Sequence, residues 1–417
     1  MERTKLKVAV TKEGVMTIDK KAEVYERRTT CRACHSEAFE PVLSLGSQYL
    51  VRFVPEIDLS LPKSPLDLVR CTQCGLLQLQ HTVDPDLLFR EFWYRSGINE
   101  SMRAALKDVV DSVVPYSPGG TWLDIGANDG YLLSQLPDKF TRIACEPARN
   151  FHDELHKISD HVIGDYFTAD NDCLWRSNRT GGCDVITTAA MFYDLDNPDR
   201  FVADISNVLA PGGLWVNQLN DSPSMVRANA FDSICHEHLC YYDIFSLKEL
   251  YARHGLVIVD VTHNDVNGGS MRVFAQKKVA GVLPMSLAHF RKVSSSDAQH
   301  FAVRVKKWKQ VMGEILDVPG KPWWLYGAST KGCVLLQYLD YQGAFEAIAD
   351  RNPSKHKLLM SGIWLPITDE DAMRAHKPQR LMVLPWAFRE EFVKRERSLM
   401  DSGTVMVLPL PNIEFVL

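Results

Sequence analysis

Apolar runs alternate with amphipathic segments through the middle of the chain. Six runs have the length and composition of short buried strands: 121–125, 142–146, 162–167, 183–190, 211–218 and 256–261. Three segments repeat their apolar residues at helical spacing: 102–114, 201–209 and 246–255. Strands that alternate with helices in this way predict a doubly wound parallel sheet, so the expected fold class is α/β.

The stretch Thr121–Tyr131 reads as a buried strand that runs into a glycine turn and opens a helix. Gly126 and Gly130 allow the backbone to bend and to approach a ligand closely. Open parallel sheets bind nucleotides at the carboxyl edge of their strands. The turn has two glycines and lacks the Gly-x-Gly-x-x-Gly pattern of dinucleotide sites. A nucleotide ligand other than NAD is therefore favoured.

Two acidic residues narrow the choice of cofactor. Asp124 lies at the end of the strand, and Glu146 ends the next strand about 20 residues past the turn, where a carboxylate can accept both ribose hydroxyls. Two acids at these positions suit a ligand with a cationic centre and a ribose with free hydroxyls. S-adenosylmethionine (SAM) fits this description better than NAD. The expected cofactor contacts, including Asp165 at the adenine, are Asp124, Gly126, Asn128, Gly130, Glu146 and Asp165.

Two Cys-x-x-Cys pairs, Cys31/Cys34 and Cys71/Cys74, precede this region. Each pair directs two thiolates at one centre, and two such pairs complete a closed tetrahedral S4 site, which favours structural zinc. Segment 37–69 between the pairs is rich in proline and is expected to loop out. Ten cysteines in so long a chain are not a disulfide scaffold, and the pairing fits a reducing, cytoplasmic setting.

Length and charge exclude several classes of protein and of partner. A chain of 417 residues, 46% of them hydrophobic, predicts two or three domains with sizeable cores. A net charge of −5 gives no reason to expect a nucleic-acid polymer as partner. The sequence lacks an apolar run of membrane-spanning length, and its first residues do not resemble a secretory signal. We expect a cytoplasmic protein that acts as a monomer.

The segment Asp232–Tyr242 holds the densest group of titratable residues, including His236, Glu237 and His238. In an extended segment both imidazoles lie on one face and Glu237 on the other. A metal site or a structural pair is possible. Acid/base catalysis is favoured, because histidine titrates near neutrality and a neighbouring glutamate can orient it or raise its pKa.

Three other segments carry candidate substrate contacts. Tyr94 follows two other aromatic residues and either packs as an elbow or covers the cofactor as a lid. Asn267 lies in a turn-rich loop that either contacts substrate or closes a hairpin. From residue 323 a second strand, glycine turn and helix begin, after a helical connection over 282–316. There Lys331 and Arg351 suit an anionic diphosphate, unless this unit is a scaffold without ligand.

Taken in order, these motifs resemble the zinc-containing sugar C-methyltransferases, which act at C-3 of nucleotide-linked 4-keto-deoxysugars. The resemblance covers about residues 30–417. It implies an N-terminal extension (1–29), a zinc-binding module (30–85), a class I methyltransferase domain that binds SAM (86–280), and a linker helix with a C-terminal Rossmann-like domain (281–417). It also implies His238 as the base and Tyr94 and Ser96 as substrate contacts, and we add Tyr242 to these contacts.

The chain departs from the resemblance at two places. Cys235 stands where some of these enzymes carry tyrosine, and Met191–Asp194 replaces a histidine-containing segment. The expected reaction is C-methylation of a nucleotide-diphosphate 4-keto-deoxysugar. His238, helped by Glu237, forms an enolate, and Tyr94 or His236 stabilises the oxyanion. Two alternatives remain: O-methylation of a sugar or another small molecule, and a non-catalytic zinc and nucleotide-fold binding protein.

Overall fold

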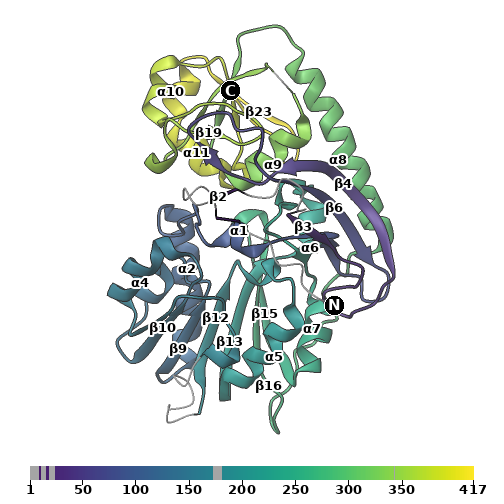
Figure 1. Cartoon of the computed structure of the whole chain (residues 1–417), viewed down its shortest axis with the longest axis vertical. Coiled ribbons are helices and arrows are strands. Elements are labelled where there is room, and N and C mark those ends of the chain that lie inside the picture. The colour runs from purple at the N-terminus through teal and green to yellow at the C-terminus, as the bar shows by residue number, and fades with distance from the viewer. Residues whose placement is uncertain (1–8, 11–15, 18–23, 172–180, 342) are drawn as a thin grey trace.

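The computed structural model describes residues 9–10, 16–17, 24–171, 181–341 and 343–417 (Figure 1). A seven-stranded sheet forms the middle domain, in the order β11-β10-β9-β12-β13-β16-β15. In chain order the strands are β9 (Gly120–Ile125), β10 (Phe140–Cys145), β11 (His161–Ile163), β12 (Cys183–Ala189), β13 (Leu209–Asn220), β15 (Leu256–Asn264) and β16 (Ser270–Lys277). The first five are parallel and β16 is antiparallel to both of its neighbours. The expected α/β sheet is present, and its last two strands form a hairpin.

Helices cover both faces of this sheet (Figure 1). One face carries α2 (Glu100–Val113), α3 (Tyr131–Ser134) and α4 (His152–Ile158); the other carries α5 (Pro198–Val208) and α7 (Ile244–Arg253). The apolar stripe of α2 packs on the fully buried Trp122. The start of α7 is fixed by a capping box between Asp243 and Ser246. The carboxyl ends of the strands are left open toward the rest of the molecule.

The N-terminal cysteine domain is a second sheet, with strand order β14-β7-β6-β4. Its own strands are β4 (Phe39–Tyr49), β6 (Lys63–Cys71) and β7 (Leu77–Leu79), whereas β14 (Cys240–Tyr241) comes from the middle domain. The expectation that segment 37–69 loops out is wrong, because β4 and β6 pair as a long antiparallel hairpin. Buried aliphatic side chains such as Leu43, Leu66 and Leu68 hold this hairpin against the core despite its prolines.

Shorter elements complete the cysteine domain and the middle domain. They are β1 (Ala9–Val10), β2 (Met16–Thr17), β3 (Tyr25–Arg27), β5 (Phe53–Val54), β8 (His81–Val83), α1 (Pro85–Phe89), η1 (Val114–Tyr116), η2 (Arg149–Phe151), η3 (Ala169–Asn171), η4 (Phe192–Asp194), α6 (Ser222–Arg227), η5 (Phe231–Ser233) and η6 (Val266–Gly268).

The C-terminal domain is a six-stranded sheet in the order β20-β18-β17-β21-β22-β23. Its strands are β17 (Trp323–Tyr326), β18 (Phe345–Ala349), β20 (Ile367–Thr368), β21 (Arg380–Val383), β22 (Val405–Leu408) and β23 (Glu414–Val416). Its helices are α9 (Thr330–Leu339), α10 (Glu370–His376), α11 (Arg389–Arg395) and α12 (Arg397–Asp401), with η7 (Pro353–Lys355) and η8 (Trp386–Phe388). The five parallel strands β20-β18-β17-β21-β22 repeat the order of β11-β10-β9-β12-β13 in the middle domain.

A long helix, α8 (Ser295–Leu316), leads into the C-terminal domain and runs beside β4 along one side of the molecule (Figure 1). The helix expected over 282–316 starts only at Ser295, because Ser294 caps it and Pro284 interrupts the chain before it. The cysteine domain also contacts the C-terminal domain, through pairing of β5 with β19 (Leu359–Met360). It thus pairs with both α/β domains.

Candidate active site

A cavity of about 620 Å³ lies where the three domains meet. The cysteine domain contributes Phe53 and Thr82 to its wall, the middle domain contributes the glycine turn after β9, and the C-terminal domain contributes the turn after β17. Both turns lie at carboxyl ends of parallel strands, where α/β sheets bind ligands. Two strand–turn–helix units therefore open into one cavity.

The turn after β9 is held by the carboxylate at the end of β10. Glu146 is 6% exposed; its Oε2 accepts a hydrogen bond from the backbone N–H of Asn128 at 2.7 Å, and its Oε1 accepts one from Ala148 at 2.8 Å. Each oxygen keeps a second lone pair for a ligand hydroxyl. Gly126 and Asn128 have positive φ angles of 74° and 51°, and both line the cavity. The assignment of this carboxylate to the ribose of the cofactor stays a prediction.

Asp124 is a buried acid whose negative charge a cationic ligand can neutralise. Its Oδ1 accepts a hydrogen bond from the Thr187 hydroxyl at 2.6 Å, and the residue lines the cavity. Burial is the main cause that raises its pKa to about 7, and the nearby Glu146 adds to the shift. SAM carries a sulfonium and an ammonium, so its positive charge and its ribose both fit the acidic groups of this turn.

Two expected cofactor residues lie outside the cavity wall. Gly130 has φ 76°, precedes α3, and a Cβ there would lie 2.0 Å from Cδ1 of Ile158, so close packing requires this glycine. Asp165 accepts a hydrogen bond from Arg90 at 3.0 Å, and its side chain is 59% exposed. Their assignment to the cofactor stays a prediction.

The glycine turn also holds the segment that carries Tyr94. The Asn128 side chain donates to the carbonyl oxygen of Tyr94 at 2.9 Å and accepts from the backbone N–H of Ser96 at 2.9 Å. Asp129 accepts from the Ser96 hydroxyl at 2.6 Å and from the backbone N–H of Gly97 at 2.8 Å. Tyr94 and Ser96 both line the cavity, so this segment forms part of its wall, and its role as a lid stays a prediction. Asp129 was not recognised from the sequence.

His238 lines the cavity with a defined tautomer. Its Nδ1 lies 2.9 Å from the carbonyl oxygen of Ser233, which can only accept, so Nδ1 carries the proton and Nε2 keeps a lone pair. Burial first, and then the positive charge of Lys331, lower its pKa to about 3. The expectation that Glu237 orients this ring or raises its pKa is not met, because the Ser233 carbonyl orients it and its pKa is lowered.

The ring of His236 is held by a hydrogen bond to the cysteine domain. Its Nε2 donates to the carbonyl oxygen of Ser64 in β6 at 2.9 Å, and the residue is 2% exposed. Burial lowers its pKa to about 4, so the ring is neutral and its Nδ1 is a lone pair. That Nδ1 is buried and has no partner among the described residues. His236 therefore connects the His-Glu-His segment to the cysteine domain and offers the cavity an acceptor.

Two carboxyl groups lie beside these histidines in the cavity wall. Oε2 of Glu237 and Oδ1 of Asp194 are both buried and have no hydrogen-bond partner within the described part of the chain. Burial raises the pKa of both, and the proximity of Glu237 raises that of Asp194 further. Asp194 and its neighbour Tyr193 were missed as site residues. The available signal was their position at the carboxyl end of β12.

The C-terminal end of the cavity is built as a copy of the glycine-turn site. Asp350 follows β18 as Glu146 follows β10, and its Oδ2 accepts from the backbone N–H of Ala328 at 2.7 Å. The expected diphosphate residues Lys331 and Arg351 line this end of the cavity, together with Lys355. Arg351 also lies 3.6 Å from Glu370 and from Glu391.

Two further residues that were expected to contact the substrate are Tyr242 and Asn267. Tyr242 is fully buried against Phe192 and is not part of the cavity wall. Asn267 lies in η6, and its side chain is outside the described residues. Its neighbours Val266 and Ser270 do line the cavity. Both assignments stay predictions.

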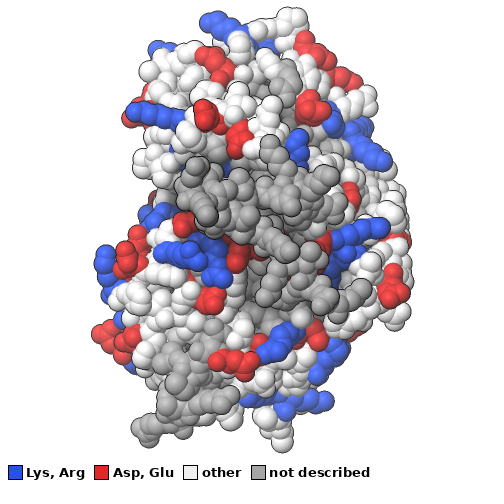
Figure 2. Space-filling view, in the orientation of Figure 1, with Lys and Arg blue, Asp and Glu red and all other residues white. Residues whose placement is uncertain are grey.

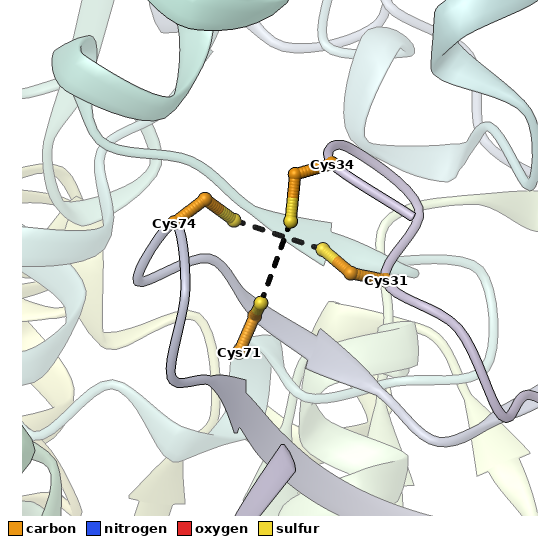
Figure 3. A group of neighbouring side chains, drawn as sticks. All are labelled: Cys31, Cys34, Cys71 and Cys74. Atoms are coloured by element: carbon orange, nitrogen blue, oxygen red, sulfur yellow. Dashed lines mark hydrogen bonds between the residues drawn. The ribbon is translucent and has the colours of Figure 1, made fainter. Parts of the chain in front are cut away.

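The four cysteine sulfurs converge on one point (Figure 3). Sγ of Cys31 lies 3.7 Å from Sγ of Cys74, Sγ of Cys34 lies 3.6 Å from Sγ of Cys71, and all four lie within 4.8 Å of one another. A tetrahedral zinc with Zn–S bonds of about 2.3 Å requires sulfurs about 3.8 Å apart, so the set fits the ion. The four thiolates would hold zinc in a closed site, and none of the four cysteines lines the cavity.

Lys and Arg side chains are mixed with Asp and Glu over the visible described surface (Figure 2). Among the described residues, none of the helices is both long and apolar enough to cross a bilayer.

Known proteins match the chain over nearly all of its length. Three family models match in succession: a putative zinc binding domain over 31–89, a methyltransferase domain over 98–261, and a C-methyltransferase C-terminal domain over 265–411. C-methyltransferase NovU of Streptomyces niveus is 28% identical over 405 residues, which span 92% of this chain and 95% of NovU.

Solved structures overlap the chain only in part. The PH0226 protein of Pyrococcus horikoshii OT3 covers 44% of this chain and 95% of its own, with 12% identity and a TM-score of 0.36. N-methyltransferase NodS of Bradyrhizobium japonicum WM9, in complex with S-adenosyl-L-homocysteine, covers 44% and 90%, with 12% identity and a TM-score of 0.35. Such partial overlaps assign neither a substrate nor a reaction.

The order of the matched domains, the SAM-type turn and the four-cysteine zinc site agree with one another. The non-catalytic alternative is thereby set aside. The chain is a SAM-dependent methyltransferase, and in the order of its matched domains it is similar to the zinc-containing C-methyltransferases.

Proposed function

We propose that the enzyme methylates a carbon of a nucleotide-activated 4-keto-deoxysugar, at C-3, through an enolate. The observation that carries this proposal is His238. Its tautomer leaves an Nε2 lone pair in the cavity that also holds the SAM-type turn. The carbon next to a ketone can lose a proton because the enolate places the negative charge on oxygen, whereas an isolated sugar carbon has no such stabilisation.

The other end of the cavity supports a nucleotide diphosphate. Lys331 lies in the first turn of α9, where the backbone N–H groups of a helix favour anions. Arg351 and Lys355 line the same end and can bind phosphate oxygens. Asp350 has the position after β18 that Glu146, the proposed ribose ligand, has after β10 in the middle domain. A substrate that spans from this end to His238 would bring a sugar next to the cofactor turn.

The mechanism then depends mostly on positioning. His238 takes the C-3 proton on Nε2, and the C–H electrons form the enolate double bond. SAM, when bound, supplies an electrophilic methyl group. Asp124, Asn128 and Glu146 hold the cofactor side, and the Tyr94–Gly97 segment closes over it. Orienting two bound reactants in this way contributes a large part of the acceleration.

Among the groups expected to stabilise the oxyanion, the geometry favours hydroxyls over His236. A neutral His236 has already committed its only N–H to Ser64, so it offers the substrate a lone pair and no donor. Glu237 and Asp194 are acceptors when ionised. Tyr94 is 44% exposed and lines the cavity, so its hydroxyl is a candidate donor.

The test is methyl transfer from SAM carrying a ¹³C methyl group to a panel of nucleotide 4-keto-6-deoxysugars, followed by NMR of the product. A methyl signal bonded to C-3 is the expected result. A methoxyl signal would identify an O-methyltransferase instead. Absence of transfer to every ketosugar, with SAM binding intact, would overturn the proposed substrate class.

A further inference from the structure

The enolate needs a hydrogen-bond donor as well as a base. When His238 removes the proton, the carbonyl oxygen gains negative charge, and preorganised donors at that oxygen lower the barrier. Around His238, the buried Nδ1 of His236 can only accept, and Glu237 and Asp194, whose pKa values are raised by burial, can donate only while they are protonated. A donor that does not depend on the protonation of a carboxyl group must come from another side chain in the same wall.

Tyr193 is fixed directly against the base. Its ring centroid lies 4.5 Å from that of His238, in an edge-to-face arrangement with an interplanar angle of 68°. The backbone carbonyl of Tyr193 also accepts from the N–H of Leu239 at 2.9 Å, next in sequence to the histidine. A side-chain contact and a backbone hydrogen bond therefore set the position of Tyr193 relative to His238.

The Tyr193 hydroxyl is free to serve a ligand. The side chain is 6% exposed and lines the cavity. Its hydroxyl has no hydrogen-bond partner among the described residues, and it is not one of the buried polar atoms sealed from solvent. A phenol that packs only for its ring would gain nothing from such a hydroxyl, since an unpaired polar group in a mostly buried position is costly.

We propose that Tyr193 is a catalytic residue whose hydroxyl donates a hydrogen bond to the substrate oxygen that becomes the enolate oxygen. This inference rests on the proposed function. The C-3 proton goes to Nε2 of His238, its electron pair forms the C=C bond, and the carbonyl π pair moves to the oxygen that Tyr193 holds. The enolate carbon then bonds the methyl, the C–S electrons return to sulfur, the C=O bond re-forms, and His238 releases its proton to solvent.

The surroundings keep Tyr193 in its donor form. Burial raises the pKa of its phenol well above the usual value, and the nearby Asp194 and Cys235 shift it in the same direction. Cys235 is itself fully buried, and burial raises its pKa too, so it stays a neutral thiol. Tyr193 therefore remains protonated at neutral pH and donates throughout the reaction.

The test compares Tyr193→Phe, Tyr94→Phe and the wild type, with Tyr116→Phe as the matched control because Tyr116 is 84% exposed and outside the cavity. Two rates are measured with a nucleotide 4-ketosugar: methyl transfer, and exchange of the C-3 proton with deuterated water in the absence of SAM. Calorimetry with SAM and thermal melting check that the cofactor site and the fold are intact.

We expect Tyr193→Phe to lower both rates by about 10²-fold, the range found for single oxyanion donors, while KM and the Kd of SAM stay unchanged. Wild-type rates in Tyr193→Phe would overturn the inference and leave the proposed function standing. Loss confined to Tyr94→Phe would assign the donor to Tyr94 and also overturn it. If the wild type neither exchanges nor methylates any ketosugar, the proposed function fails and the role of Tyr193 fails with it.

A second variant distinguishes a role of the Tyr193 hydroxyl from a role of the ring in packing. Should Tyr193→Phe melt at a lower temperature than the wild type, 3-fluorotyrosine at position 193 keeps the shape of the ring and makes its hydroxyl a stronger donor. A changed exchange rate in that variant supports the inference, and an unchanged rate contradicts it.

Discussion

The imidazole of His238 donates from Nδ1 to the backbone carbonyl oxygen of Ser233, at 2.9 Å. This one bond decides which nitrogen can act as a base, because a carbonyl cannot donate. It also fixes the ring through the short turn that follows η5, without help from Glu237. The reactive nitrogen is therefore Nε2.

Replacing His238 by Asn should lower kcat by about 10²- to 10⁴-fold, the usual contribution of a general base. SAM should still bind with wild-type affinity, because the residue is not part of the glycine turn. Rate measurements and calorimetry on the variant check both statements. His161→Asn is the matched control, since that histidine is exposed in β11. Full activity in His238→Asn would remove His238 from the mechanism.

The affinity for SAM should depend on pH through Asp124. Its pKa of about 7 means that the free enzyme carries a protonated Asp124 below neutrality, mainly because the group is buried. A cationic ligand favours the ionised form, so binding below pH 7 must expel a proton. We expect the affinity to rise by up to about tenfold per pH unit toward pH 7 and to level off above it. Calorimetry in buffers of different ionisation enthalpy reports the proton directly.

Asp124→Asn should remove this pH dependence, because an amide does not titrate. Equal proton release by Asp124→Asn and the wild type would assign the effect to another group, with Glu146 the next candidate because its pKa is also raised by burial.

Asp129 should hold the Tyr94 segment in place. Asp129→Ala removes acceptors for the Ser96 hydroxyl and the Gly97 N–H, and hydrogen bonds to a charged group contribute about 1.5–3 kcal/mol each. We expect SAM to bind at least about tenfold more weakly, and trypsin to cleave faster after Arg95. Asp138→Ala is the control, since Asp138 is fully exposed. Unchanged cleavage and affinity would contradict a clamp.

Zinc should affect activity through the shared sheet. β14 follows the His-Glu-His segment directly and pairs with β7 of the cysteine domain, while His236 bonds to Ser64 in β6. We expect one zinc per chain by elemental analysis, and loss of zinc, thermal stability and kcat in Cys71→Ser. Cys183→Ser lies outside the cluster and should keep its zinc. A metal-free protein with full stability would contradict this role.

The sequence predicted the parts of the site that depend on local spacing. The turn from Asp124 to Asn128 and the carboxylate of Glu146 are separated by one βαβ unit, so a strand order typical of α/β sheets brings them together. The two Cys-x-x-Cys pairs converge for a similar reason: each knuckle sets its own geometry. In these cases the residues of the motif make the contacts themselves.

Contacts made by backbone groups or between distant segments were not predictable in this way. Ser233 orients His238 through a backbone carbonyl, which carries no residue-type signal. Asp194 and Tyr193 are brought to His238 by the pairing of distant segments, and sequence patterns do not report which loops meet. The hairpin of β4 and β6 was predicted to be a loop because the prolines of segment 37–69 were given more weight than its leucines.

The most direct test of the account is incubation of the enzyme with a nucleotide 4-ketosugar in deuterated water without SAM, followed by mass spectrometry. The account predicts that the wild type adds one deuterium at C-3 and that His238→Asn adds none. Absence of deuterium with the wild type, when methyl transfer to the same compound proceeds on addition of SAM, would contradict deprotonation by His238 as an independent step and with it the enolate mechanism.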